Sequence, residues 1–421
     1  MIRLILLAAT LVVWIHEPAD PGTRGPNHPR THGSDQHRFD DVIRNLRNPD
    51  ARARMAALRA LRDAKHVEAI APIAPLVNDP EDDIQLEAIA TELSFYLVDP
   101  VEPRRRVALI VESRRRSHAE AAFEAGPLAV WPRPVPPELV SRLLRAVDDA
   151  TAPVRHDAIY ALGVIARPPL PGEASQQLIQ ALDHYDPVVR AAAARVAGRL
   201  RLAAAGPALF KAVNDSQQPV RYAAMRALGE IGDQTAVQAL TQQLDHYRKG
   251  EGAWSALDGL AKVAHVSSIP VFKARLNDRD PFIRRAAAEG LGRAGDGSAT
   301  ATLETAIGTE SSEMVRAAIA FALQKLGGNY IPRLIESLDS DKLAPQVAGY
   351  LMELGPPIAD SLLPHLKDPD ASIRGGVAVT LGAVGSQTHV PALQGLAQDR
   401  DRDVARSAVR AIERINMRGT S

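Results

Sequence analysis

The chain has no cysteine among its 421 residues, so a disulfide framework, a thiolate nucleophile and a thiolate metal site are all excluded. Aromatic residues make up only 4% of the sequence, which favours closely packed helices with small side chains over a β-sandwich. Neither sign of charge is in excess, with 50 Lys plus Arg against 50 Asp plus Glu. Because a protein that mainly binds a polyanion needs a basic surplus, nucleic acid is disfavoured as the principal partner.

Catalytic motifs with fixed spacing are also missing. The sequence contains no G-x-x-x-x-G-K-[ST] phosphate loop, no H-E-x-x-H zinc motif and no G-x-S-x-G nucleophile elbow. Two copies of Leu-Asp-His-Tyr, ending at Tyr185 and Tyr247, lie two repeats apart, which is too far for the two histidines to share one ion. We therefore assign no catalytic residue, no metal site and no cofactor.

The N-terminal segment differs in composition from the rest of the chain. Residues 1–16 form an apolar run with the length of a signal-peptide core, which is short for a membrane span. Residues 17–38 are rich in Pro, Gly and His, as is typical of a disordered linker. We expect an exported, periplasmic or membrane-tethered protein, with a cytoplasmic location as the alternative.

A recurring stretch organises the remainder of the chain. Residues 214–233 read NDSQQPVRYAAMRALGEIGD, and residues 277–296 read NDRDPFIRRAAAEGLGRAGD. Further copies recur at a period of about 31 residues from residue 39 to residue 415, leaving a short tail at 416–421. This period predicts an all-α fold, a right-handed α-solenoid of about 11–12 two-helix repeats.

Each repeat is expected to contain two helices. In DPVVRAAAARVAG, Asp186 suits the N-cap of the second helix and Pro187 its first turn, and we expect Gly198 and its counterparts to end that helix. Counted from the repeated arginine, positions −1, +3, +7 and +10 fall on one side of the helix and form a buried stripe. In one copy these residues are Val220, Ala224, Leu228 and Ile231.

The pattern D-x-x-V-R-x-x-A-A-x-A-L-G resembles the HEAT repeat, in the short bacterial form named after phycobiliprotein lyases. The resemblance covers nearly everything after residue 40, and it implies that the second helices line the concave side of the solenoid. It also implies that the Asp and Arg residues at the start of the second helix form a ladder along the stack. Here the ladder arginines are Arg155, Arg190, Arg221, Arg284, Arg316 and Arg374. We expect them to stabilise the fold rather than to bind a partner.

Residues at +1 and +5 from the arginine lie opposite the buried stripe, so the resemblance places them on the concave side. Aromatic and arginine side chains are enriched in protein interfaces, and we expect an exposed row that binds a protein or peptide. This inner row consists of His156, Tyr160, Arg195, Tyr222, Arg226, Trp254, Asp258, Arg285 and Glu289. Because Ala253 replaces the arginine next to it, Trp254 is predicted to be the least constrained ring and the main anchor. Packing of these rings between helices is the alternative.

Residues 101–138 interrupt the period. They contain two arginine triplets, at 104–106 and 114–116, and the stretch WPRPVPP at 131–137. Consecutive prolines forbid a helix, so this stretch is predicted to be extended. The triplets suit either the solvent-facing side of a helix or an acidic partner.

These features favour a non-catalytic scaffold or adaptor that binds a protein or peptide along the concave face. The first alternative is an enzyme or enzyme subunit of the phycobilin-lyase-like class, which the name of the repeat implies. The second is a nucleic-acid-binding HEAT-like protein, which the acids Asp258 and Glu289 in the inner row disfavour.

Overall fold

The computed structural model describes residues 32–101 and 117–419. The predicted signal-like segment, most of the predicted linker and both arginine triplets lie outside the described residues. The chain divides after Asp41 into two units, of which the first contributes only the beginning of helix α1 to the described part. The second unit holds all the other elements.

The described residues are all-α, as predicted. They contain α1 to α23 and short 3₁₀ turns, and their only pairing of β type is an isolated antiparallel bridge between Leu97 and Val130. No helix in this part of the chain is both long enough and apolar enough to span a membrane.

Two helices alternate along the chain in each repeat. The first helices are α1 (His32–Asn45), α3 (Ile70–Ile73), α6 (Pro137–Ala146), α8 (Gly172–Gln180), α10 (Gly206–Ala212), α12 (Ala236–Tyr247), α14 (Ile269–Arg275), α16 (Thr300–Thr309), α18 (Ile331–Glu336), α20 (Ala359–Leu362) and α22 (Val390–Leu396). The second helices are α2 (Ala51–Asp63), α4 (Asp82–Tyr96), α7 (Ala152–Ile165), α9 (Pro187–Arg199), α11 (Gln218–Ile231), α13 (Gly250–Val263), α15 (Pro281–Ala294), α17 (Glu313–Lys325), α19 (Ala344–Leu354), α21 (Ala371–Val384) and α23 (Arg402–Gly419). The predicted α-solenoid is therefore confirmed.

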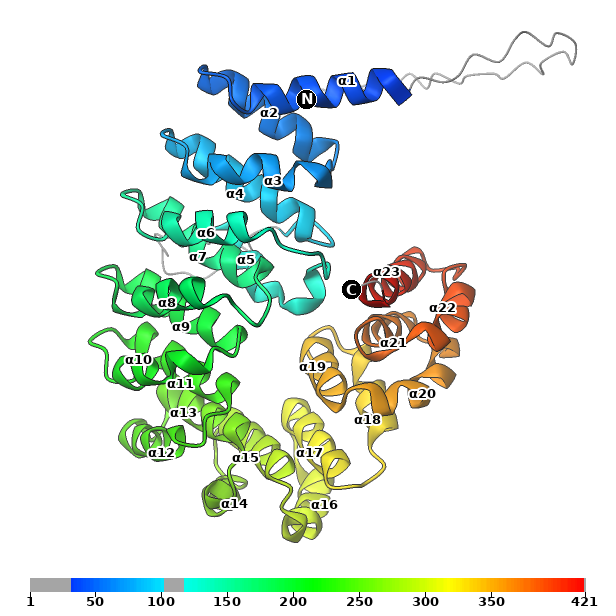
Figure 1. Cartoon of the computed structure of the whole chain (residues 1–421). Helices are drawn as coiled ribbons and strands as arrows, with labels where there is room; N and C mark the ends of the chain where they lie inside the picture. Colours follow the sequence, from blue (N-terminus) through cyan, green and yellow to red (C-terminus); the bar gives the residue numbers. More distant parts are fainter. Residues whose placement is uncertain (1–31, 102–116, 420–421) are drawn as a thin grey trace, which may run out of the picture. The chain divides into compact units, whose positions relative to one another are not determined.

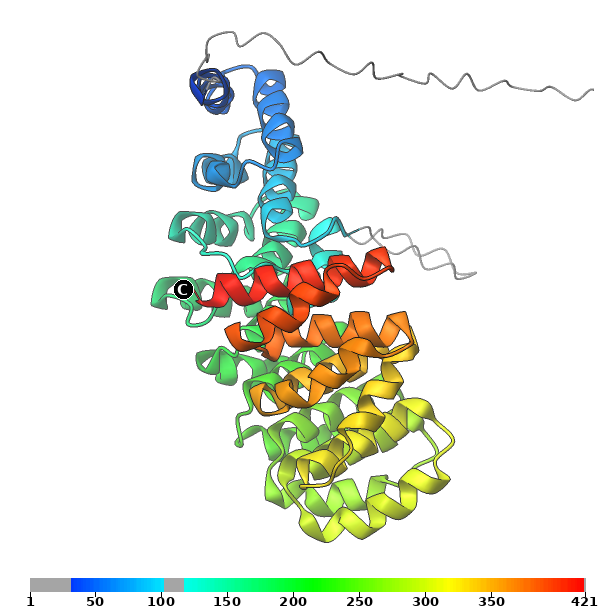
Figure 2. The ribbon, with the colours of Figure 1, turned by 90° about the vertical axis from the view of Figure 1, so that its right-hand side faces the viewer.

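Within the second unit the repeats follow a curve. Figure 1 shows helices α9, α11, α13, α15 and α17 on the inner side of this curve and helices α8, α10, α12, α14 and α16 on the outer side. Figure 2 shows the same stack from the side, with the second helices of successive repeats next to one another. We call the side formed by the second helices the inner face.

Two boundaries differ from those predicted. Helix α1 begins at His32, so residues 32–38, which we assigned to the linker, are helical. Helix α23 continues through residue 416 to Gly419, because its apolar positions Ala408, Ala411 and Ile415 remain buried to the end. The predicted tail therefore begins as helix.

The glycine eight residues after the repeated arginine has another role than the predicted one. Gly198, Gly229 and Gly292 lie inside their helices rather than at the ends. A Cβ on Gly292 would lie 2.5 Å from the Cα of Ala322 on the next second helix, and one on Gly229 would lie 2.7 Å from the Cα of Gly259. These glycines allow neighbouring second helices to approach closely. The left-handed C-caps are formed instead by Gly232 and Gly295, with φ of 77° and 70°.

The repeated arginines connect each repeat to itself and to the next. The Nη1 group of Arg284 donates to the carbonyl oxygens of Asp278 (2.8 Å) and Arg279 (3.1 Å), which end the first part of its own repeat. Its Nε and Nη2 groups pair with both carboxylate oxygens of Glu310 in the following repeat, at 2.8 and 2.9 Å. The same two-carbonyl contact is made by Arg54, Arg155, Arg190, Arg221, Arg316 and Arg374.

The link to the next repeat varies along the stack. Arg155, Arg190 and Arg374 reach the carboxylates of Asp186, Asp215 and Asp399. Arg221 donates instead to the hydroxyl of Tyr247 (2.6 Å). Among the described residues Arg316 makes no hydrogen bond or ion pair beyond its own repeat, and Val347 replaces the arginine in the next copy. The ladder is therefore interrupted between α17 and α21.

We predict that Arg221→Ala lowers the free energy of unfolding by about 1–3 kcal/mol, because the carbonyls of Asp215 and Ser216 lose a charged donor. Urea denaturation, monitored by circular dichroism, measures this loss. Arg406→Ala is the control, since the side chain of Arg406 is 57% exposed and pairs only with the neighbouring Asp403. An unchanged denaturation midpoint for Arg221→Ala would reassign this arginine from stability to recognition.

The insertion adds one helix to the inner face. Helix α5 (His118–Ala125) packs against α7, and its Phe123 ring contacts Tyr160, with 5.4 Å between ring centroids. Residues 131–136 form no helix, as predicted, whereas Pro137, the last residue of the proline-rich stretch, begins α6. The last helix also contacts this region, because Arg414 donates to the carbonyl of Leu128 in the insertion (2.6 Å) and Arg410 pairs with Asp99 just before it.

Candidate binding site on the inner face

Most side chains of the inner row are paired from one repeat to the next. Arg195 donates to the hydroxyl of Tyr160 (3.0 Å), and Arg226 pairs with Glu251 (3.3 Å). The rings of Tyr222 and Tyr247 meet edge to face, with 5.5 Å between their centroids. The prediction that the inner row is exposed is wrong for Tyr160 and Glu289, each of which is only 4% exposed. Tyr160 is covered by Phe123 of α5 in the insertion, and Glu289 by Tyr350 of α19.

Trp254 is not the loosely held ring that we predicted. Its Nε1 group donates to Asp280 Oδ2 (2.6 Å), and its ring packs on Phe282 with 4.5 Å between centroids. Asp280 is the N-cap of α15, so Trp254 links α13 to the following repeat. It therefore replaces the contact that Ala253 cannot make. His156 reaches the N-cap Asp186 in the same way, at 3.1 Å.

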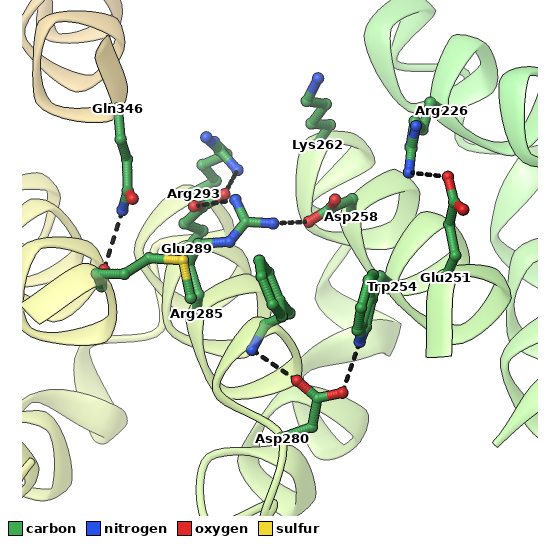
Figure 3. A network of polar contacts seen from close by, with 12 residues as sticks. Arg226, Glu251, Trp254, Asp258, Lys262, Asp280, Arg285, Glu289, Arg293 and Gln346 are labelled. Carbon is green, nitrogen blue, oxygen red and sulfur yellow. Dashed lines mark hydrogen bonds and ion pairs between the residues drawn. The ribbon is translucent and has the colours of Figure 1, made fainter. Parts of the chain in front are cut away.

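A buried charge network fills the inner face between α13 and α19 (Figure 3). Arg285 donates to Asp258 (2.6 Å) and to Glu289 (2.9 Å). Glu289 also accepts from Arg293 (3.0 Å) and from the hydroxyl of Tyr350 (2.5 Å) on α19. Arg293 in turn pairs with Glu353, which also lies on α19 (2.9 Å). These contacts pass over α17, the second helix that lies between α15 and α19.

The network determines the charge of its members. Burial alone would raise the pKa of Glu289, but the guanidinium groups of Arg285 and Arg293 lower it below its ordinary value. Burial raises the pKa of Asp258, although Arg285 opposes the rise. Because Arg285 and Glu289 already bind each other, this part of the inner face presents few unpaired groups to a partner.

An open cavity lies on the inner face nearer the N-terminal end of the second unit. It has a volume of about 830 Å³ and is lined by α2, α4, α5, α7 and one residue of α9. We call it the inner cavity. Its lining residues include Met55, Arg59, Asp83, Leu86, Glu87, Ala90, Leu93, Ser117, His118, Glu120, Pro153, His156, Asp157, Tyr160 and Val188. Of the inner row, only His156 and Tyr160 belong to it.

A larger cavity, of about 1030 Å³, lies on the outer side between α6 and α8. Its rim is formed by the proline-rich residues 133–137 and 167–171. The guanidinium group of Arg167 at this rim donates hydrogen bonds to the backbone carbonyls of Val164, Ala166 and Trp131. The inner cavity, in contrast, lies on the face that the second helices form.

Asp157 is the main polar residue of the inner cavity that sequence reasoning missed. Its Oδ1 atom is buried and has no hydrogen-bond partner in the described residues. Burial raises the pKa of this carboxyl, although Ser117 and the nearby His118 oppose the rise. Asp157 stands at +2 from the repeated arginine, a position that we assigned to neither the buried stripe nor the inner row. No three His, Asp or Glu side chains of the described residues meet as a metal site requires.

Glu92 is a second buried carboxyl outside the predicted set. It is 1% exposed, and neither carboxylate oxygen has a hydrogen-bond partner in the part of the chain that the structure describes. Burial therefore raises its pKa well above its ordinary value of 4.5. A signal was present in the sequence, because Glu92 occupies a +7 position of the buried stripe, where the copies aligned on an arginine have Leu or Ala.

We predict a pH-dependent gain in stability for Glu92→Gln. Above pH 4.5 the unfolded chain loses the Glu92 proton while the folded chain retains it, so wild-type stability falls as the pH rises from 4.5 towards the raised pKa. Gln cannot titrate. The free energy of unfolding of the variant, relative to that of the wild type, should therefore increase between pH 5 and pH 8 in denaturant titrations. Glu304→Gln, at an exposed side chain, serves as the control. It should change the free energy of unfolding by the same amount at pH 5 and at pH 8. A constant difference for Glu92→Gln would contradict a raised pKa.

The architecture defines the class of protein, an α-solenoid of two-helix repeats with an open cavity on its inner face. The HEAT repeats family profile matches residues 175–251, 249–324 and 359–419, which together make up half of the chain. The PBS lyase HEAT-like repeat profile matches residues 315–340. The chain belongs to the HEAT repeat family.

A curated relative is the Phycobilisome maturation protein of Synechococcus elongatus, which is 34% identical over 116 residues. The match covers 27% of this chain and 54% of that protein, so the chain spans about half the length of the relative.

Several solved structures have a similar fold. The complex of CpcE and CpcF of phycocyanin lyase from Nostoc sp. is 21% identical, with 59% of this chain and 96% of that chain covered and a TM-score of 0.41. Human deoxyhypusine hydroxylase is 20% identical, with 66% and 96% covered and a TM-score of 0.30. Kap121p bound to Nup53p is 15% identical, with 89% and 44% covered and a TM-score of 0.38. Two of these three structures are complexes of two proteins, CpcE with CpcF and Kap121p with Nup53p.

Proposed function

We propose that this chain is a maturation factor of the phycobilin-lyase-like class, which holds a protein client against its inner face. The observation that carries the proposal is the 34% identity with the Phycobilisome maturation protein over 116 residues. The PBS lyase HEAT-like repeat at residues 315–340 supports the same class.

The lining of the inner cavity favours a protein client over the free pigment as its occupant. A phycobilin carries propionate groups, and these need cationic partners when they leave water. In the part of the chain that the structure describes, the cavity has the carboxylates Asp83, Glu87, Glu120 and Asp157 but only one arginine, Arg59. In the proposed function the pigment therefore binds to the client or to a second subunit, and this chain supplies the client-binding surface.

The decisive experiment combines binding with pigment attachment. An apo-phycobiliprotein subunit is passed with the purified chain through a size-exclusion column, and pigment attachment is followed by absorbance with and without the chain. We expect co-elution and a faster attachment in the presence of the chain. Separate elution together with an unchanged rate would refute this function.

A non-catalytic adaptor for another protein is the second candidate. The inner cavity favours it, because its mixed apolar and charged lining resembles that of protein interfaces whatever the client is. Crosslinking and pull-down from the native host would support this candidate if the recovered protein were unrelated to phycobilisomes.

A further inference from the structure

The inner cavity combines an apolar floor with an acidic wall. Leu86, Ala90 and Leu93 of α4 and Pro153 of α7 supply apolar surface. Among the described residues, the lining carboxylates are those of Asp83, Glu87, Glu120 and Asp157, whereas Arg59 is the only lysine or arginine. The described residues of the lining therefore carry an excess of negative charge.

The carboxylates differ in how far they are already neutralised. Glu87 pairs with Arg62 and lies 3.9 Å from Arg59. Glu120 lies 3.7 Å from the Nη1 group of Arg195. For Asp83 and Asp157 no ion pair is formed within the described residues, and the buried Oδ1 atom of Asp157 also lacks a hydrogen bond. Because Asp157 lines the cavity and has no ion pair within the described residues, its carboxylate is the one that a cation in the cavity would neutralise.

We propose that the inner cavity receives an arginine or lysine side chain of a protein client, with its aliphatic stem on the α4 floor and its cationic head at Asp157. The excess of carboxylates selects a cation, and the apolar floor selects one that is carried on a hydrocarbon stem. The cavity volume of about 830 Å³ leaves room for the adjoining client backbone as well. The inference rests on the proposed function only for the origin of the client.

His118 and His156 do not change the sign of this selection. His156 is engaged with the carboxylate of Asp186 (3.1 Å), and His118 Nδ1 lies 3.3 Å from the carbonyl oxygen of Val101. Even when the positive charge of His118 is counted, the four lining carboxylates outnumber Arg59 and His118 among the described residues. Tyr160 is also engaged, because its hydroxyl accepts from Arg195 (3.0 Å).

The test uses the full chain and two fluorescein-labelled peptides, Gly-Ser-Arg-Ser-Gly-Arg-Ser-Gly and its citrulline counterpart. Citrulline keeps the shape of arginine and removes its charge. We expect the arginine peptide to bind more tightly, and Asp157→Asn to weaken it by about tenfold, the effect of losing one charge-assisted hydrogen bond. Asp83→Asn, at the exposed start of α4, provides a second variant in case Asp157→Asn unfolds. Glu304→Gln on the outer helix α16 is the matched control and should bind as the wild type does.

Three results would overturn the inference. The first is equal binding of the two peptides. The second is that wild type, Asp157→Asn and Asp83→Asn bind the arginine peptide equally well. The third is that spermidine displaces the arginine peptide at a lower concentration than the unlabelled arginine peptide does. The last result would make the cavity a site for a free polyamine. If the peptide results are as expected while the apo-phycobiliprotein fails to co-elute, the cationic site stands and the proposed function falls.

Discussion

Replacing Glu289 with alanine is expected to lower the free energy of unfolding by about 3–5 kcal/mol, the usual loss when one partner of a buried charge network is removed. The carboxylate accepts from Arg285, Arg293 and Tyr350, and its side chain is only 5% exposed. Without it, two half-buried guanidinium groups lie near each other with fewer acceptors. Thermal and urea denaturation of the purified variant would measure the loss.

The matched control for this substitution is Glu304→Ala, which removes an exposed glutamate and should change stability by less than about 0.5 kcal/mol. A further check is acidification. Since the pKa of Glu289 is lowered, its contribution is present above its ordinary value of 4.5 and is lost as the pH falls below that value. Equal stability of Glu289→Ala and Glu304→Ala at pH 7 would show that the network contributes nothing.

The substitution Gly292→Ala is expected to destabilise the protein by about 1–3 kcal/mol, the range for overfilling a packed interior. In most helices the same change stabilises, because glycine loses more backbone entropy on folding than alanine. Here the added methyl group would lie 2.5 Å from the Cα of Ala322 and 2.9 Å from its Cβ. Helices α15 and α17 would have to separate to accommodate it.

Gly349→Ala on α19 is the control for the sign of this effect. A Cβ at residue 349 meets no atom within 4 Å, so this substitution should stabilise the protein by about 0.5–1 kcal/mol. Urea denaturation of the two variants in parallel gives both values. If Gly292→Ala also stabilised the protein, the close approach of α15 and α17 would be without energetic consequence.

The fold could be predicted because the same pattern of residues occurs in many copies along the chain. The recurring arginine, the apolar stripe and the period of about 31 residues each specify two helices and a neighbour of the same kind. A single residue such as Gly292 was harder to interpret. Its position near the helix end agreed with a C-cap, whereas its function depends on the distance to Ala322 in another repeat.

The site could be predicted only as a face. Periodicity places Trp254 and Asp258 on the inner side of α13, but it does not show that Asp280 and Arg285 of the next repeat already bind them. Those pairings depend on how closely successive second helices approach. Asp157 was missed for a related reason, since its position becomes part of a cavity only where α5 of the insertion lies beside it.

The contacts that pass over α17 have a consequence for how this array unfolds. A stack whose repeats touch only their immediate neighbours can lose units from either end, one after another. Here Glu289 and Arg293 of α15 bind Tyr350 and Glu353 of α19, so three consecutive repeats are tied together where the arginine ladder is interrupted. Shortening the protein to a point between residues 295 and 343 would leave Glu289 without Tyr350 and Arg293 without Glu353. Truncated forms that end in this interval should therefore be prone to proteolysis, whereas those that end after residue 354 retain the complete block.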